Sequence, residues 1–252
     1  MEHLQAIVFD VDGTLADTEN IHRAAFNEAF KEHGVDWQWS KKDYARLLSV
    51  SGGFERMKFY SGESDQISKR TYPDELIKTI HKTKSEIYAQ LLLSSDIQLR
   101  SGIERLISEA RKENIQLAIA TNTNRKNVEI LLDKNLPSDW NNWFAAIETS
   151  DTVSIKKPSA AIYLAVLKKI NMKPSCVVAL EDTENGLSAA KAAGISTIIT
   201  THQFTHQSHF PEALLVVDSA GSPSRPFNIL NGKIVKERWL TVRVLDKLLG
   251  QR

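Results

Sequence analysis

The chain has 252 residues, of which 42% are hydrophobic and 25% are charged, which suits one sizeable globular domain or a core with a smaller insert. The net charge of +1 gives no sign of a nucleic-acid or membrane surface, so any affinity for anions must come from local groups. Cys176 is the single cysteine, which excludes an internal disulfide, and no apolar run approaches the roughly 20 residues of a membrane span. We expect a monomer, and a cytoplasmic one, because the chain enters a strand at once and leaves no room for a signal peptide.

The first predicted strand is the apolar run from Ala6 to Phe9, and two aspartates follow it closely. Asp10 stands at the carboxyl end of this strand, where open α/β sheets bind their ligands, and Asp12 is near enough to share a site. Two carboxylates at this spacing repel each other unless a cation or a shared proton offsets them. Gly13 permits a tight turn. The two aspartates are therefore candidate catalytic or metal-binding residues, although a strand followed by an Asx-type turn explains the same sequence.

Residues 17 to 95 show a helical pattern throughout. An apolar stripe through Phe26 predicts one helix that Gly34 ends, and Ser40 with Asp43 resembles a capping box at the start of the next helix. We therefore expect a helical cap inserted between the first and second strands of a sheet. A small lobe of this kind can close over a ligand and exclude water.

The insert also carries candidate anion-binding residues. A long helix near its end has Lys84 among its inward-facing apolar residues and His81 at the edge of that stripe. A lysine in this position must snorkel to solvent, pair with another group, or face a ligand. Gly52 and Gly53 open a short helix, and paired glycines leave backbone N–H groups free to bind an anion, although a plain loop is the alternative. Together with Arg56, these residues allow a second anion site.

Five further apolar runs predict strands, and helical patterns separate most of them. Strands that alternate with helices indicate a parallel sheet covered on both faces, so we expect an α/β core. The expected core domain comprises residues 1–16 and 96–252, and the expected cap comprises residues 17–95. Asn231-Gly232 predicts a hairpin at the edge of the sheet, with residues 233–235 as its second strand. The five runs are 117–120, 145–147, 177–180, 197–199 and 214–217.

Polar residues follow three of the predicted core strands. Thr121 offers a hydroxyl and Asn122 a backbone N–H above the sheet, or the pair begins a helix as its N-cap. Lys157 lies in a loop before a helix, where it could face the site or be solvated. Glu181 and Asp182 end another strand, and they suit Mg²⁺, which prefers oxygen ligands, or cap the next helix.

The order of these motifs, Asp-x-Asp-Gly-Thr, Thr, Lys-Pro and Glu-Asp, resembles that of the haloacid dehalogenase superfamily of phosphohydrolases over about residues 6–194. The resemblance implies a Rossmann-like parallel-sheet core with an inserted helical cap, and a Mg²⁺-dependent phosphatase that works through an aspartyl phosphate. It implies that Asp10 is the nucleophile and that Asp12 is the general acid and then the base. The dehalogenases lack an acid at the place of Asp12, so its presence favours phosphoryl transfer.

The resemblance also implies which residues bind the metal and the phosphoryl group. Thr121 and Lys157 would hold phosphoryl oxygens and offset charge in the transition state. The implied Mg²⁺ ligands are Asp10, the backbone carbonyl of Asp12, and Asp182, with Glu181 assisting.

The insert is similar to that of the CbbY-type sugar phosphatases, which act on xylulose 1,5-bisphosphate, an inhibitory misfire product of rubisco. The similar segments are 34–39, Tyr44, 51–53 and 81–84. A bisphosphate substrate gives a physical reason for two anion sites, and the implied product is xylulose 5-phosphate. The implied substrate-binding residues are Glu19 and Tyr44, then Gly52, Gly53, Arg56, His81 and Lys84 for the distal phosphate, and Asn122 in the core.

Two alternative functions stay open. A phosphosugar mutase of the β-phosphoglucomutase kind shares the core motifs, although the insert matches the phosphatase better. A non-catalytic phosphometabolite sensor is the remote alternative, and the complete set of candidate catalytic and metal-binding residues argues against it. The chain also departs from the family where Phe54 replaces a usual lysine, and where Ser159-Ala160-Ala161 replaces Ala-Pro-Asp. Three histidines lie in a loop without a cysteine or an adjacent acid, so we interpret them as solvated loop residues and not as metal ligands. They are His202, His206 and His209.

Overall fold

The computed structural model describes residues 3–68, 72–233 and 235–250, without the side chains of residues 64–68. The chain divides into two compact units, which we describe separately. The core unit comprises Met1–Asp17 and Ile97–Arg252, and the cap unit comprises Thr18–Asp96. The boundaries expected from the sequence lie one residue earlier at each junction. Among the described residues, no helix has both the length and the apolar character needed to cross a membrane.

The core unit contains a seven-stranded sheet in the order β3-β2-β1-β4-β5-β6-β7, and all its neighbouring pairs are parallel except β6 with β7. The chain runs from β1 outward through β2 and β3, then crosses back to β4, so the strand order reverses between β1 and β4. Open α/β sheets bind ligands at such a reversal. The strands are β1 Ala6–Phe9, β2 Gln116–Ala120, β3 Phe144–Glu148, β4 Val177–Glu181, β5 Ser196–Thr200, β6 Leu215–Val217 and β7 Ile229–Gly232.

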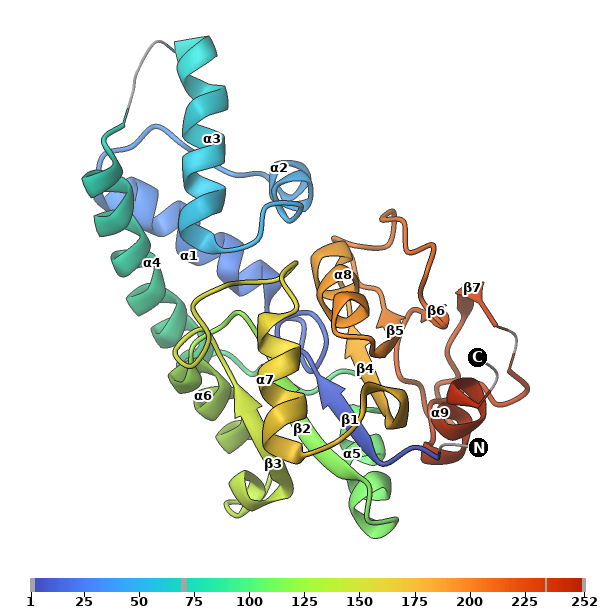
Figure 1. The fold of residues 1–252 in the computed structure, drawn as a ribbon. Helices are drawn as coiled ribbons and strands as arrows, with labels where there is room; N and C mark the ends of the chain where they lie inside the picture. The colour runs from blue at the N-terminus through green and yellow to red at the C-terminus, as the bar shows by residue number, and fades with distance from the viewer. Residues whose placement is uncertain (1–2, 69–71, 234, 251–252) are drawn as a thin grey trace. The chain divides into compact units, whose positions relative to one another are not determined.

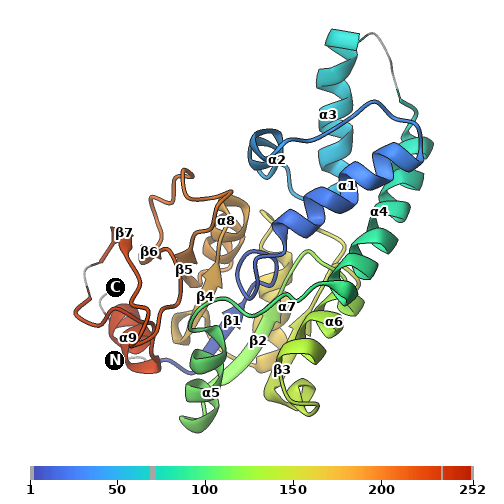
Figure 2. The ribbon, with the colours of Figure 1, turned by 180° about the vertical axis from the view of Figure 1, so that it is seen from behind.

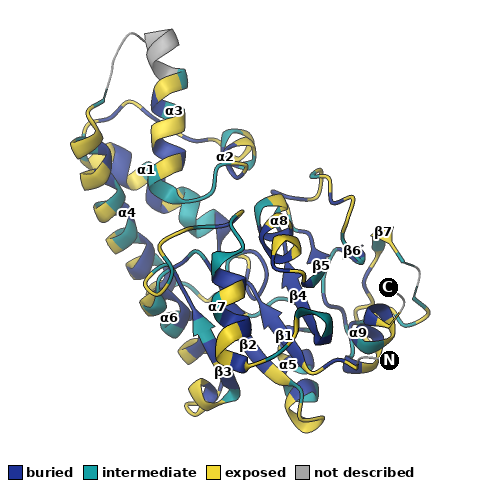
Figure 3. Cartoon of the chain, viewed as in Figure 1, coloured by how far each residue is buried: buried dark blue, intermediate teal, exposed yellow. Residues whose placement is uncertain are grey.

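Helices cover both faces of this sheet, which confirms the predicted α/β class (Figures 1 and 2). Because side chains alternate along a strand, Ala6 and Val8 join the apolar cluster beneath α7 and α8, while Ile7 and Phe9 point to the other face. All four are fully buried, which is why β1 is apolar throughout (Figure 3). One face carries α7 Ala161–Ile170 and α8 Glu184–Ala192, and the other carries α5 Ile103–Lys112, α6 Arg125–Asn135 and α9 Val242–Leu249.

The hairpin expected at Asn231-Gly232 is wrong. Both residues belong to β7, which pairs antiparallel with β6 at the edge of the sheet. Gly232 has a positive φ of 92°, and a Cβ there would lie 2.7 Å from the Leu214 carbonyl oxygen, so this glycine permits a close approach to the neighbouring strand. Ile234, in the expected second strand, lies outside the described residues.

The cap unit is helical, as predicted, and α1 packs against α4. Its interior is aromatic: the rings of Phe26, Phe30, Trp37 and Trp39 lie against one another, with centroid distances of 4.6 Å between Phe26 and Trp39 and 4.9 Å between Phe30 and Trp39. The helix after the paired glycines is longer than the short helix expected. The four helices are α1 Glu19–Glu32, α2 Lys41–Leu47, α3 Gly53–Ser68 and α4 Asp74–Ser94.

The predicted capping box begins α2. The Ser40 side chain accepts a hydrogen bond from the Asp43 backbone N–H, and the Asp43 carboxylate accepts one from the Ser40 backbone N–H at 3.1 Å. The hydroxyl of Ser40 holds the pKa of Asp43 below its usual value. Two N–H groups that a helix start would otherwise leave unpaired are thus satisfied.

We expect Ser40→Ala to lower the free energy of unfolding by about 1 kcal/mol, because the Asp43 N–H loses its acceptor. Chemical denaturation followed by circular dichroism measures this loss. Ser40→Thr keeps the hydroxyl and is expected to retain most of the stability. Equal losses in the two variants would contradict a capping role for the hydroxyl.

Candidate active site

A tight turn carries the first predicted site residues directly after β1. The Asp10 backbone N–H donates to the Leu180 carbonyl at 3.0 Å, which places Asp10 beside the end of β4. Gly13 has a positive φ of 83°, and its N–H donates to the Ala16 carbonyl at 2.8 Å. A Cβ at Gly13 would overlap the Asp182 carboxylate, so a glycine is required on both counts.

Three buried carboxylates meet at the reversal point of the sheet. Asp10, Glu181 and Asp182 each offer an oxygen, and these oxygens lie within 4.8 Å of one another. The register of the parallel strands explains this: Phe9 pairs with Leu180, so the residues that follow β1 and end β4 are neighbours. An all-oxygen donor set of this kind fits Mg²⁺. Among the described residues, the Asp12 side chain does not belong to this group, and Asp12 itself is half-buried.

Lys157 provides the positive charge beside these carboxylates. Its ammonium lies 2.6 Å from Asp10 Oδ1 and 2.5 Å from Glu181 Oε1, and it donates to the Ala120 carbonyl at 2.8 Å. The side chain is only 4% exposed, so Lys157 is not the solvated loop lysine that its sequence context allowed. A buried charge is stable only with partners, and here every ammonium proton has one.

Burial and ion pairing shift the pKa values of this cluster in opposite directions. Burial raises the pKa of Asp10 well above its usual value, and Lys157 opposes that rise. Burial likewise raises the pKa of Glu181, again against Lys157. For Lys157, burial acts to lower the pKa, but the carboxylates of Asp10 and Glu181 outweigh it and hold the pKa above its usual value.

Thr121 and Asn122 follow β2 at the same edge of the sheet. Thr121 is buried, its N–H donates to the Glu148 carbonyl at 3.1 Å, and its hydroxyl oxygen accepts from the Thr123 N–H at 3.2 Å. The Asn122 side-chain oxygen accepts from the Lys157 backbone N–H at 3.2 Å and so helps to fix the lysine loop. Neither residue begins α6, because the N-cap is Asn124.

Tyr163 is a site residue that the sequence analysis missed. Its hydroxyl donates to Glu181 Oε1 at 2.5 Å from the buried face of α7. Burial, together with the neighbouring Glu181 carboxylate, raises the pKa of Tyr163 well above its usual value, so the hydroxyl keeps its proton. Tyr163 lies within the apolar pattern of α7, and that pattern carries no sign of a polar contact.

His202 is the second missed residue, and the expectation of a solvated side chain is wrong for it. Its ring is 4% exposed, and Nε2 lies 2.9 Å from Asp182 Oδ2. The Thr14 hydroxyl donates to the other oxygen of Asp182 at 3.1 Å. The signal available was position: His202 follows β5, the neighbour of β4, at the edge that carries the carboxylates. His206 and His209 are exposed.

In the cap unit, three of the predicted substrate-binding residues form a hydrogen-bonded chain. The Tyr44 hydroxyl donates to Glu19 Oε2 at 2.5 Å, and Arg56 Nη1 donates to the Tyr44 oxygen at 3.1 Å. Arg56 also donates to the Val50 carbonyl at 3.3 Å and 3.2 Å, and its guanidinium lies 5.2 Å from the centre of the Tyr44 ring. All three side chains are buried.

Lys84 belongs to a second cluster in the cap unit. It is 6% exposed, so it does not snorkel to solvent. Its ammonium lies 2.7 Å from His22 Nδ1, 4.6 Å from the centre of the Phe26 ring and 4.9 Å from that of Tyr88. An ammonium next to an imidazole nitrogen and two aromatic rings is a group of the kind that can also bind a phosphate.

The paired glycines and His81 lie beside this second cluster. Gly52 has a positive φ of 93°, and Gly53 begins α3. A Cβ at Gly53 would lie 2.8 Å from His81 Nε2 and 3.2 Å from the Phe26 ring, so the histidine and the glycine turn are in contact. The cap unit therefore places Gly53 and His81 next to Phe26, the ring that Lys84 contacts, whereas the Arg56 guanidinium lies in the chain with Tyr44 and Glu19.

Comparison with known proteins fits this geometry, because residues 4–194 match the haloacid dehalogenase-like hydrolases. The chain belongs to this hydrolase family. It is 45% identical over 224 residues to the plasmid-encoded protein CbbY of Cupriavidus necator, with 88% of each chain covered. It is also 41% identical to CbbY of Rhodobacter sphaeroides, solved in complex with phosphate, with 86% and 94% of the two chains covered and a TM-score of 0.77.

A mutant of the Rhodobacter sphaeroides protein has been solved in complex with xylulose-(1,5)bisphosphate. It is 40% identical to this hydrolase, again with 86% and 94% of the two chains covered and a TM-score of 0.77. These relatives and the family match confirm the expected resemblance, and the chain is a phosphatase of the haloacid dehalogenase-like type.

One glycine of the hydrolase core has a steric role that can be tested. A Cβ at Gly186, in the first turn of α8, would overlap the carboxylate of Glu181. We expect Gly186→Ala to lower the free energy of unfolding by about 1–3 kcal/mol, as overpacking of a dense core does, and to displace Glu181 from Lys157. Thermal denaturation measures the stability.

Gly62→Ala is the matched control, because among the described residues no atom outside the adjacent residues and the helix's own backbone lies within 4 Å of a Cβ at that position in helix α3. Helix propensity makes it neutral or stabilising by up to about 1 kcal/mol. Similar melting temperatures for Gly186→Ala and the unaltered protein would contradict the predicted overlap.

Proposed function

We propose that this phosphatase hydrolyses a sugar bisphosphate, namely xylulose 1,5-bisphosphate to xylulose 5-phosphate and phosphate. The observation that carries the proposal is the buried Asp10 carboxylate, paired with Lys157 beside Glu181 and Asp182. The substrate is supported by the complex of the Rhodobacter sphaeroides relative with that compound, and by the buried cations of the cap unit.

In the proposed reaction, an oxygen of Asp10 attacks the phosphorus atom while the bond to the sugar oxygen breaks. Asp12 donates its proton to the departing sugar oxygen, so that the sugar leaves with a neutral hydroxyl group. Asp12 then takes a proton from water, and the oxygen of this water attacks the phosphorus of the aspartyl phosphate. Inorganic phosphate leaves and the Asp10 carboxylate is restored.

Lys157 and Thr121 have electrostatic roles in this proposal. A carboxylate cannot readily approach an anionic phosphate without nearby positive charge. Lys157 opposes the rise that burial causes in the pKa of Asp10, which favours the ionised form that attacks. The hydroxyl of Thr121 and the ammonium of Lys157 would hold phosphoryl oxygens.

The metal-binding residues of the proposal are Asp10, the backbone carbonyl of Asp12, and Asp182, with Glu181 assisting. Bound Mg²⁺ would supply positive charge to the phosphoryl group and to these carboxylates. Three carboxylates and one ammonium carry an excess of two negative charges when ionised, which a divalent cation matches. His202 and Thr14 hold Asp182 in place for this role.

The cap unit would recognise the part of the substrate that does not react. Glu19 and Tyr44 suit sugar hydroxyl groups, because a carboxylate and a phenol can accept and donate hydrogen bonds. The distal phosphate would be bound by Arg56, Lys84 and His81 with the backbone of Gly52 and Gly53. Asn122 would act from the core unit, where it fixes Lys157.

The test is phosphate release from a panel of sugar mono- and bisphosphates, with Mg²⁺ and with EDTA. We expect release from xylulose 1,5-bisphosphate that EDTA abolishes and added Mg²⁺ restores. Asp10→Asn should remove turnover while the circular dichroism spectrum stays unchanged, because the nucleophile is lost but its shape is kept. Release that persists in EDTA would contradict the metal requirement.

Two outcomes would favour the alternative functions. Conversion of glucose 1-phosphate to glucose 6-phosphate without free phosphate indicates a mutase. Tight binding of a phosphosugar by a folded protein that releases no phosphate from any ester indicates a sensor.

We expect Lys84→Ala to raise KM for the bisphosphate far more than for a monophosphate, because the lost cation would face the distal group. Lys82→Ala is the matched control, since Lys82 is exposed on the same helix. Initial rates over a range of both substrates measure the two KM values. An equal rise for both substrates would place Lys84 outside the distal site.

A further inference from the structure

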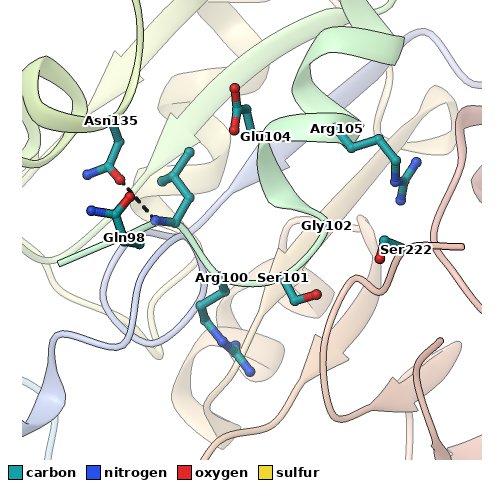
Figure 4. A pocket seen from close by; sticks show the side chains of 9 residues that line it. Gln98, Arg100, Ser101, Gly102, Glu104, Arg105, Asn135 and Ser222 are labelled. Atoms are coloured by element: carbon teal, nitrogen blue, oxygen red, sulfur yellow. Dashed lines mark hydrogen bonds between the residues drawn. The ribbon is translucent and has the colours of Figure 1, made fainter. Parts of the chain in front are cut away.

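Arg100 is a buried cation that the proposed reaction does not use. It lies in the segment by which the chain re-enters the core unit at Ile97, shortly before α5 (Figure 4). Its side chain is 7% exposed. Its guanidinium contacts the Gly13 carbonyl, the Thr200 carbonyl and hydroxyl at 2.9 Å each, the Thr201 carbonyl at 2.5 Å, the Asp218 carbonyl at 3.0 Å and Asp17 Oδ1 at 3.2 Å.

These acceptors share one location, the carboxyl edge of the sheet. Thr200 ends β5, Asp218 follows β6, and Gly13 lies in the turn after β1. Carbonyl oxygens that converge on one point need donors, and a guanidinium offers five N–H groups in a rigid plane. Burial lowers the pKa of Arg100, while the carboxylates of Asp17, Asp182 and Asp218 oppose that effect. A guanidinium keeps its proton under such conditions.

The backbone of the same segment also holds the turn after β1. The Arg100 N–H donates to the Leu15 carbonyl at 2.8 Å, and Leu99 forms an antiparallel bridge with Ala16. Residues 13–17 are thus held from one side by the backbone of residues 99–100 and by the Arg100 side chain. On the other side of Gly13 lie Asp182 and His202, which a Cβ at this glycine would strike.

We propose that Arg100 is a positioning residue: by binding the Gly13 carbonyl it fixes the turn that carries Asp12 and keeps that turn against Asp182. Its effect on turnover rests on the proposed function, whereas its hold on the turn does not. A shift of the turn would move the general acid relative to the leaving oxygen, and misplacement by about 1 Å can cost roughly 100-fold in rate.

Arg105 supplies a matched control from the same part of the chain. Both arginines line an open hollow of about 270 Å³, and Figure 4 shows their side chains leading away from the segment in different directions. Arg105 also donates to backbone carbonyls, but to those of Gly221 and Leu240, and it pairs with Glu109 at 2.9 Å. Among the described residues, these hydrogen-bond and ion-pair partners of Arg105 all lie outside the turn after β1.

The experiment compares Arg100→Met, Arg100→Lys and Arg105→Met by hydrogen exchange and by steady-state kinetics with Mg²⁺ and xylulose 1,5-bisphosphate. The amides of Gly13, Thr14 and Leu15 are hydrogen-bonded within the turn, so their exchange reports its order. We expect faster exchange over residues 10–16 and a kcat lower by about 10- to 100-fold in Arg100→Met, with KM little changed. Arg100→Lys should lie between, and Arg105→Met should match the unaltered protein in both measurements.

Three outcomes would overturn the proposal: exchange over residues 10–16 and kcat both unchanged in the Arg100 variants, a raised KM with unchanged kcat, or the same losses in Arg105→Met. If Arg100→Met does not fold, Arg100→Lys is compared with Arg105→Lys, since both keep the charge. If the unaltered protein hydrolyses no phosphate ester, the proposed function fails, and the exchange comparison alone decides whether Arg100 holds the turn.

Discussion

The structure of the core unit depends on one buried ammonium group shared by two carboxylates. Lys157 reaches Asp10 and Glu181 from the loop before α7, and its third N–H donates to the Ala120 carbonyl. Without this cation, the carboxylates at the ends of β1 and β4 would repel one another at a buried position, where solvent screens charge poorly. Two neighbouring side chains support this charge pairing: Asn122 fixes the loop that carries Lys157, and Tyr163 donates a hydrogen bond to Glu181.

Strand order explains why these groups meet. β1 is flanked by β2 on one side and β4 on the other, so residues that follow these three strands share one edge. Thr121 follows β2, Asp10 follows β1, and Glu181 ends β4. The fold therefore assembles a site from segments separated by more than a hundred positions, using only the parallel register of its central strands.

The sequence predicted the α/β class, the helical insert and the polar residues at the strand ends, because apolar periodicity and strand-end position are local signals. It did not reveal Tyr163, His202 or Arg100, since their partners depend on which strands are neighbours. The Asn-Gly pair shows the opposite failure. This pair prefers a turn locally, but in the fold it extends β7. Pairing with β6 gives the strand the backbone hydrogen bonds that a hairpin would have given it.

The pairing of Lys84 with His22 fixes the chemical form of that imidazole. An ammonium can only donate, so Nδ1 of His22 must present its lone pair, and the ring proton then resides on Nε2. The ring also lies flat on Tyr88, with centroids 3.8 Å apart and planes inclined by 2°. The Lys84 ammonium thus selects one tautomer of the His22 ring, and the stacking on Tyr88 holds that ring where the ammonium can reach it.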